Sequence, residues 1–369
     1  DKKTGKRRPR GLHRPRIRIK HIDNKRSFIG FGSPKYHDVE DRNEENSAAF
    51  ERRFLDLKTL AFALTNASHS LASACRAFEV EHGKQEAEEH GRITKTYIDY
   101  NCRDVLATQE LLEKLQAEFD RHPIELDPSR AFSSASIAKA YPRAMNLNTP
   151  REQFQDISPQ FLGYAMTAYC GGRAECRIRN TVVPVIHCDF LSMYPTVNSL
   201  MQLWSLLTAE RLEIVDATSE AQRLLDGLTH DACFDPAVWQ HFVFFARIQP
   251  DSDVLPVRAH YAETGNAYNI GVNPLTSDAP LWYAGPDLCA SKLLSGKSPK
   301  VLKAFRLVPQ GLQKGLRPVR LRGEIQIDPA TQDFFRSLIE ERKRIKNRPG
   351  ITADERARLD AFLKVLANS

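Results

Sequence analysis

Hydrophobic and polar residues follow two periods along this 369-residue chain, and each period predicts a different kind of element. An apolar run at 181–190 ends in an acid and predicts a buried strand. Isoleucines placed among basic residues at 16–31 predict a β-hairpin. Apolar residues at helical spacing predict one helix after Ser70 and a second over 101–119. The chain is therefore expected to combine strands and helices.

Each of the two predicted helices has one apolar face that should be buried. Ser70 is expected to cap the first helix, whose buried face carries Leu71, Ala74, Cys75 and Phe78. In the second helix, the spacing assigns the buried side to Val105, Leu112, Leu115 and Phe119. His122-Pro123 ends that helix, and short helices are expected in the connection over 123–160.

The C-terminal segment predicts a pair of helices. Asp328-Pro329 should start the first one, because proline is favoured at the first helical position, and the helix should run to about Arg348. Pro349-Gly350 predicts a turn. Thr352 and Glu355 have the spacing of a capping box, so a second helix should follow to the end of the chain. The pair would form a helical hairpin.

Composition limits the class of protein. The length suits two or three domains, and 41% hydrophobic residues is ordinary for globular cores. No run of about 18 apolar residues is long enough for a membrane span, and residue 1 does not open a secretory signal. The seven cysteines are scattered without a CxxC pair, which is typical of reduced thiols and gives no zinc pattern.

The net charge of +7 is unevenly distributed. Residues 1–27 hold twelve Lys and Arg against two Asp, so the rest of the chain is slightly acidic. A local basic patch of this kind favours nucleic-acid binding more than the overall charge does. A solvated basic tail explains the same residues equally well.

The segment after the predicted strand carries the strongest chemical signal in the chain. Asp189, at the tip of the strand, would present a carboxylate to a divalent ion, because a buried acid without a partner is costly. Pro195 should push Tyr194 out of the α region, so that its ring forms a floor beneath a sugar. The alternative is a strand, a turn and a helix with an aspartate cap. Backbone N–H groups that can bind a triphosphate lie at Leu191, Ser192 and Met193.

Three further groups suit phosphate chemistry. Paired glycines let a backbone approach a phosphate, and the candidates here are Tyr169, Gly171, Gly172 and Arg173. Basic and amide side chains four residues apart share a helix face and could hold a triphosphate, at Arg342 with Lys346 and at Lys364 with Asn368. Read without context, the first group is a plain turn and the others are solvated helix faces.

Tyr100 and Asp104 form a second candidate site. They are four apart and share a helix face, so Asp104 can bind a metal ion while the phenol of Tyr100 orients a water. Asp56, in the apolar segment upstream, is expected to be structural rather than catalytic.

Together these motifs resemble those of the family B DNA polymerases. Asp189-Phe-Leu-Ser-Met-Tyr-Pro-Thr196 resembles motif A, Tyr169-Cys-Gly-Gly172 the YxGG element, and Lys364 to Ser369 the start of motif B. Tyr100 to Asp104 resembles the third motif of the proofreading 3′–5′ exonucleases. The resemblance implies that Tyr194 is a steric gate against a 2′-hydroxyl group and that Asp189 and Asp104 bind metal. It implies catalytic roles for Asp189, Tyr194, Lys364, Tyr100 and Asp104.

The implied fold is α/β plus α+β. Residues 1–125 would form the C-terminal part of an RNase H-like exonuclease domain, and 126–180 a linker with the YxGG element. An antiparallel-sheet palm would follow at 181–327, then a truncated two-helix fingers hairpin at 328–369. Residues 205–300 could be an inserted element for protein priming or simply an elaborated palm, and both interpretations stay open.

The implied function is DNA-dependent DNA synthesis with proofreading in replication. Primer-template DNA and dNTPs would be the partners, accessory replication proteins are further candidates, and two Mg²⁺ ions, or Mn²⁺ in their place, would be the cofactors. The location would be cytoplasmic, at a nucleoid or a viral replication site. The family's first two exonuclease motifs and its Asp-Thr-Asp motif are expected outside residues 1–369, so we expect this fragment to be inactive alone.

Two other functions fit parts of the same pattern. The protein could be a nuclease whose palm-like part is degenerate. It could also be a non-catalytic nucleic-acid-binding protein that uses residues 1–27 and the helical hairpin. Asp189, Tyr194, Lys364 and Asn368 together argue against pure binding, because binding alone needs no such set.

Overall fold

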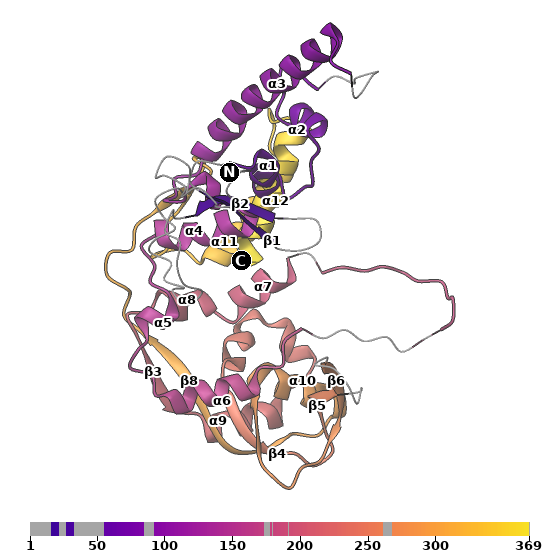
Figure 1. Cartoon of the computed structure of the whole chain (residues 1–369). Coiled ribbons are helices and arrows are strands. Elements are labelled where there is room, and N and C mark those ends of the chain that lie inside the picture. The colour runs from indigo at the N-terminus through magenta and orange to yellow at the C-terminus, as the bar shows by residue number, and fades with distance from the viewer. Residues whose placement is uncertain are drawn as a thin grey trace, which may run out of the picture. The chain divides into compact units, whose positions relative to one another are not determined.

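The chain divides into two compact units, Asp1–Ala140 and Tyr141–Ser369, in a computed structural model. Figure 1 labels the helices and strands of both units. The structure describes residues 16–21, 27–32, 55–84, 92–172, 178, 180–190, 192–260 and 268–368. All strand pairs in the described residues are antiparallel, and helices accompany them in both units. This mixture confirms the expected combination of helix and antiparallel sheet. The RNase H-like, palm and fingers assignments stay predictions.

The first unit opens with the predicted hairpin. Strand β1 (Arg16–His21) pairs with β2 (Ser27–Gly32) in an antiparallel register in which Ile17 lies opposite Phe31. The turn that joins them lies outside the described residues. The alternation of isoleucine with basic residues was therefore sufficient to predict this element.

Side-chain caps fix the first two helices. Asp56 accepts hydrogen bonds from the backbone N–H groups of Lys58 and Thr59 at the start of α1 (Leu57–Thr65). This confirms a structural role for Asp56. Ser70 caps α2 (Leu71–Ala77) and exchanges hydrogen bonds with Ser73, as a capping box does. The predicted N-terminus of α2 is confirmed.

Helix α3 (Lys95–Asp120) is longer than predicted. It begins six residues early, where the Thr94 hydroxyl accepts from the N–H of Tyr97. The predicted buried positions Val105 and Leu112 are wrong, because these side chains are 60% and 38% exposed. The buried stripe repeats every four residues, so its first member is the small Ala107 and not the expected Val105. The stripe is Ala107, Leu111, Leu115 and Phe119.

Short helices connect the hairpin and α1–α3 to the sheet of the second unit. They match the expected connection over 123–160 in kind. Helix α4 includes the boundary between the two units. The elements are η3 (Pro128–Arg130), α4 (Ser134–Ala144), α5 (Pro150–Gln153) and α6 (Pro159–Ala168).

A four-stranded antiparallel sheet forms the core of the second unit, with strand order β3, β8, β4, β7. Alternate side chains point to opposite faces, so each face takes its own helices. Ala246 and Ile248 face α9 (Thr218–Gly227) and α10 (Gly285–Ser295). On the other face Trp282 stacks on Tyr164 of α6, with ring centroids 4.2 Å apart. The strands are β3 (Arg211–Asp216), β4 (Phe245–Gln249), β7 (Leu281–Ala284) and β8 (Lys300–Gln310).

The remaining small elements complete this unit. Two further hairpins are β5 (Asp253–His260) with β6 (Tyr268–Leu275), and β9 (Val319–Leu321) with β10 (Ile325–Ile327). The 3₁₀ segments are η4 (Asp231–Phe234) and η5 (Pro236–Phe242), and the short helices are α7 (Met193–Leu200) and α8 (Leu203–Thr208).

The predicted buried strand at 181–190 is wrong in this structure. The segment is extended, but it belongs to none of the described sheets and its side chains are exposed. Val182, Val185 and Ile186 are at least 81% exposed. A strand forms only where a neighbouring strand pairs with its backbone N–H and C=O groups, and no described strand pairs with residues 181–190. The apolar pattern identified a strand-forming sequence without supplying its partner.

The C-terminal helical hairpin forms as predicted, but its first helix starts later. Helix α11 (Phe334–Lys346) begins after Asp333, which accepts from the N–H of Arg336, whereas Asp328 caps only a single turn. Trp204 fixes that turn by donating to the carbonyl of Pro329 and stacking on Phe334. Gly350 turns the chain with a φ of +79°, and Thr352 accepts from the N–H of Glu355 at the start of α12 (Ala353–Asn368).

Gly285 is closely packed at the edge of the sheet, so a substitution there tests that packing. A Cβ there would lie 2.1 Å from the carbonyl oxygen of Phe242 and 2.7 Å from the ring of Phe244. We expect Gly285→Ala to lower the free energy of unfolding by about 1–3 kcal/mol, because backbone atoms must move. Urea denaturation followed by circular dichroism measures the change.

Gly163 is the matched control. It is exposed in α6 and a Cβ there meets nothing within 4 Å. Gly163→Ala should raise stability by about 0.5–1 kcal/mol, since alanine is the better helix former. Equal effects of the two substitutions would contradict the packing described at Gly285.

Candidate functional site

The turn before α7 has an unusual backbone. Ser192, the residue before the helix, has φ 53° and ψ 39°, a left-handed conformation that is uncommon for residues other than glycine. Its carbonyl accepts from the N–H of Thr196 at 3.0 Å, which closes the first helical turn. Its hydroxyl makes no cap hydrogen bond to α7. The side chain of Ser192 is therefore available to another element, and Leu191 lies outside the described residues.

Tyr194 lies inside α7, so the prediction that Pro195 excludes it from the α region is wrong. Pro195 is in the first turn of α7, where an N–H group has no acceptor within the helix, so the missing N–H costs little. Pro195 is buried, whereas Tyr194 is 65% exposed and Met193 is 44% exposed. The tyrosine ring thus projects from the helix start into open space.

Arg342 of α11 joins three elements through one guanidinium group. Its Nε and Nη2 donate to the two carboxylate oxygens of Asp360 on α12, at 2.9 and 3.1 Å. Its Nη1 donates to the hydroxyl of Ser192 at 2.6 Å. The Arg342 side chain is only 9% exposed. Two of the predicted nucleotide-binding residues, Ser192 and Arg342, are therefore in direct contact.

The other predicted residues of the hairpin lie on its solvent side. Lys346, Lys364 and Asn368 are all exposed. The side-chain amide of Asn368 donates to the carbonyl of Lys364 at 2.6 Å, which holds it against its own helix. Lys346 and Lys364 add positive charge to the hairpin, and Asn368 is neutral. No interaction between these three side chains and Asp189 is present in the described residues.

Asp189 lies on the exposed extended segment and is itself exposed. The described residues contain no group of three or more His, Cys, Asp or Glu side chains that could hold a metal ion. One solvated carboxylate fits a Mg²⁺ ion that arrives on a triphosphate, because such an ion takes its other ligands from phosphate and water. It does not fit an ion held by protein alone.

The YxGG segment follows α6. Gly171 has φ +75°, a conformation that side chains rarely adopt, and a Cβ there would touch the ring of Tyr169. Nothing lies within 4 Å of a Cβ at Gly172, so its backbone is open to a ligand. Tyr169 is 69% exposed, and Arg173 lies outside the described residues. The space beside Gly172 would therefore allow the predicted close approach of the backbone to a phosphate.

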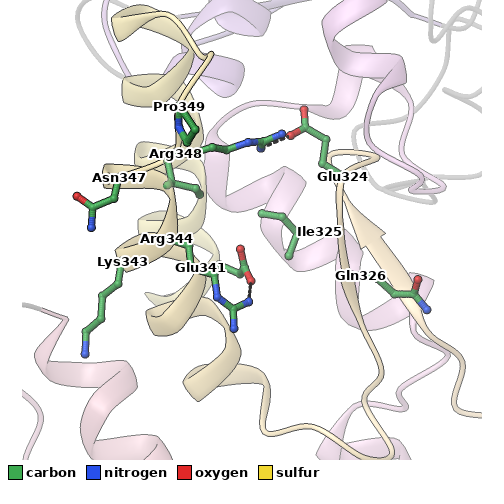
Figure 2. A pocket seen from close by; sticks show the side chains of 10 residues that line it. Glu324, Ile325, Gln326, Glu341, Lys343, Arg344, Asn347, Arg348 and Pro349 are labelled. Atoms are coloured by element: carbon green, nitrogen blue, oxygen red, sulfur yellow. Dashed lines mark hydrogen bonds and ion pairs between the residues drawn. The ribbon is translucent and has the colours of Figure 1, made fainter.

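An open groove of about 830 Å³ lies between the β9–β10 hairpin and the second half of α11 (Figure 2). Arg348 spans it to Glu324 at 2.9 Å, and Arg344 pairs with Glu341 on its own helix. Figure 2 shows Lys343 pointing away from these pairs. Two of the three basic side chains are thus neutralised, so the groove offers little net charge to a ligand.

In the first unit, Tyr100 and Asp104 occupy one face of α3. The Tyr100 ring stacks on Tyr97 with a centroid distance of 6.0 Å. Asp104 is half-buried, and its Oδ1 has no hydrogen-bond partner in the described part of the chain. Burial raises the pKa of the neighbouring Cys75 thiol, and the charges of Glu110 and Asp104 add to that rise. An acceptor without a partner, in an acidic setting, suits a cation at Asp104.

Sequence reasoning missed the ion pairs that fix α12. Asp360 reaches Arg342, and Glu355 forms a bidentate pair with the almost fully buried Arg322, at 2.8 and 2.9 Å. The backbone N–H of Arg322 also donates to the hydroxyl of buried Tyr141. These partners are 18 to 181 residues apart, so no local spacing could have revealed them.

The comparison with protein families assigns part of the chain. Residues 72–203 match the family described as DNA polymerase type B, organellar and viral. The match covers just over a third of the chain and includes Tyr100, Asp104, the YxGG segment and the turn at Ser192. Over this stretch the chain is similar to the type B DNA polymerases, which confirms the resemblance inferred from the motifs. No curated protein and no solved structure matches the chain. No helix in the described residues is long and apolar enough to cross a membrane.

The buried Arg322–Glu355 pair gives a stability prediction. We expect Glu355→Gln to lower the free energy of unfolding by about 2–4 kcal/mol, because it neutralises the carboxylate in a bidentate pair with a buried guanidinium. The control is Glu340→Gln, which removes an exposed pair with Arg336 on α11 and should change stability by less than about 0.5 kcal/mol. Thermal denaturation compares the two variants, and equal losses would contradict the role given to burial.

Proposed function

We propose that this protein is a DNA-dependent DNA polymerase whose nucleotide site is built from the turn at Ser192 and the α11–α12 hairpin. The supporting observation is the 2.6 Å hydrogen bond between Arg342 and Ser192. It joins the turn that follows Asp189 to a helix 150 residues later in the chain. Solvated helix faces, the alternative interpretation of the basic residues on α11, would leave Arg342 exposed.

The groups around this contact suit a triphosphate. The first N–H groups of α7 have no side-chain cap, and a helix N-terminus attracts anions. Arg342 contributes a fixed guanidinium, while Lys346 and Lys364 contribute mobile ammonium groups from exposed positions. A magnesium ion held beside Asp189 would supply further neutralisation of phosphate charge. The protein's share of the reaction is then to bind, orient and neutralise the polyphosphate.

The exposed ring of Tyr194 gives the site a means of sugar selection. It projects from the first turn of α7, two residues after Ser192. A ring held there would lie beneath the sugar of a nucleotide whose phosphates bind the helix N-terminus. A 2′-hydroxyl group would then meet the ring, which favours deoxyribose.

The extended segment at 181–190 fits the same function as a strand that lacks its neighbours. Its exposed valines and isoleucine would be buried if the segment joined a sheet, at about 25 cal/mol for each Å² of apolar surface removed from water. We propose that it forms part of an antiparallel palm sheet in the active polymerase, which would bring the Asp189 carboxylate to the floor of a cleft.

Proofreading is the second activity that we propose. Asp104 has an unpaired oxygen that could bind a metal ion, and Tyr100 lies one helical turn before it on α3. That spacing would let the phenol orient a water next to the ion. The other carboxylates that such a site needs do not gather around Asp104 in the described residues.

We expect the 369-residue chain alone to extend no primer with primer-template DNA, dNTPs and Mg²⁺, because nucleotidyl transfer needs carboxylates that bridge two ions. The described residues contain no group of three or more His, Cys, Asp or Glu side chains that could hold such ions. Gel analysis of a labelled primer measures extension. Template-dependent extension that is lost in Asp189→Asn would contradict this expectation, while supporting the polymerase assignment.

We expect the chain to bind dATP with Mg²⁺, and Arg342→Gln to weaken binding by at least about tenfold, because a charge-assisted hydrogen bond to phosphate is lost. Equilibrium dialysis with labelled dATP measures the Kd. Arg336→Gln is the matched control, since Arg336 lies on the same helix in an exposed pair with Glu340. Equal weakening by both substitutions, or no binding by the unaltered chain, would sink the proposed site.

A further inference from the structure

Asp360 has a position that none of the motifs assigns. It lies on α12 one turn before Lys364, and its side chain is 31% exposed. Its two carboxylate oxygens accept separate hydrogen bonds from Nε and Nη2 of Arg342. This side-on, two-point pairing fixes the plane of a guanidinium group as well as its position.

The geometry leaves one end of Arg342 directed at the turn before α7. A guanidinium group has five N–H donors. Asp360 takes one from Nε and one from Nη2, and the Ser192 hydroxyl takes one from Nη1. One N–H on each of Nη1 and Nη2 remains, and together they form the end-on fork that suits two phosphate oxygens.

We propose that Asp360 is a positioning residue for nucleotide binding, which acts by clamping Arg342 so that its end-on fork faces the N-terminus of α7. This inference rests on the proposed function. The Ser192 hydroxyl, 2.6 Å from Nη1, holds this end of the guanidinium group beside the turn and leaves the two remaining N–H groups for phosphate oxygens. Asp360 stays bound at the same time, because it uses the opposite edge of the guanidinium group.

A purely mechanical role for the pair is the main alternative. The hairpin already has an apolar seam between its helices, with Leu338 and Ile345 buried on α11 and Phe362 and Leu363 buried on α12. A buried ion pair adds little to such a seam, because desolvation of the charges offsets their attraction. A carboxylate that orients the Arg342 guanidinium group explains why position 360 carries a charge. A purely mechanical role does not explain this.

The other alternative is that Asp360 competes with the triphosphate for Arg342. Asp360 could hold Arg342 away from the triphosphate, and its removal would then strengthen binding. The two possibilities predict opposite signs for the same substitution. A carboxylate that positions Arg342 makes binding tighter, whereas a carboxylate that competes with phosphate makes it weaker.

The test is the Kd of dATP with Mg²⁺ for the 369-residue chain and its variants. We expect Asp360→Asn to weaken binding by on the order of tenfold, because the amide cannot accept two charge-assisted hydrogen bonds. Asp360→Glu keeps the carboxylate and should restore the Kd to within about threefold of the unaltered chain. An unchanged or tighter Kd for Asp360→Asn would overturn the proposal.

A structural control separates positioning from folding. Glu355→Gln disturbs α12 through its pair with Arg322 but does not contact Arg342. It should lower the thermal midpoint and leave the Kd unchanged, whereas Asp360→Asn should change the Kd. Equal effects of the two variants on the Kd would show that any loosening of α12 impairs binding, and the proposal would fall.

A double-substitution cycle completes the test. If Asp360 acts through Arg342, then Asp360→Asn should have no further effect on the Kd in a chain that already carries Arg342→Gln. A full additional loss in that background would overturn the proposal. Failure of the unaltered chain to bind dATP removes the proposed function and this inference together. Binding that is insensitive to Asp360→Asn removes only the inference.

Discussion

A guanidinium group that is removed from water needs a partner for its charge, and Arg342 meets this constraint by joining three separated segments. Asp360 supplies the counter-charge from the second helix of the hairpin, and Ser192 supplies a hydroxyl from the turn that follows Asp189. Removing either acceptor would leave a buried N–H donor of Arg342 without a hydrogen bond, which is costly. The contact therefore joins the C-terminal hairpin to the start of α7 and brings the two parts of the candidate nucleotide site together.

The sheet of the second unit gives this site its support. Both of its faces carry helices, so its strands cannot slide without disturbing two packed layers. Helix α8 links the sheet to the hairpin, because Trp204 stacks on Phe334 and donates to the carbonyl of Pro329. The start of α11 is thus set by a tryptophan far away in the sequence. The orientation of Arg342, two turns along the same helix, follows from that start.

Local features of the sequence were predictable where a side chain acts on its own neighbours. Asp56 and Ser70 cap their helices as expected, and the β1–β2 hairpin follows its alternation. Choices between equivalent signals were not predictable. Asp328 and Asp333 both accept backbone N–H groups, and the turn between them is held by the hydrogen bond from Trp204 to the carbonyl of Pro329. At the candidate site, the motifs identified Ser192 and Arg342 individually, but their contact and the role of Asp360 depend on tertiary packing alone.

Pro184, within the extended apolar segment, limits how that segment can associate. Proline has no N–H group, so one hydrogen bond of any ladder is missing on the side that this residue faces. Stacking of identical copies into a fibril needs every such bond, and a proline in the middle of the run interrupts it. The chain can therefore carry an uncovered stretch of valine and isoleucine in water with a built-in safeguard against self-assembly, while the edge away from the proline stays able to receive a neighbouring strand.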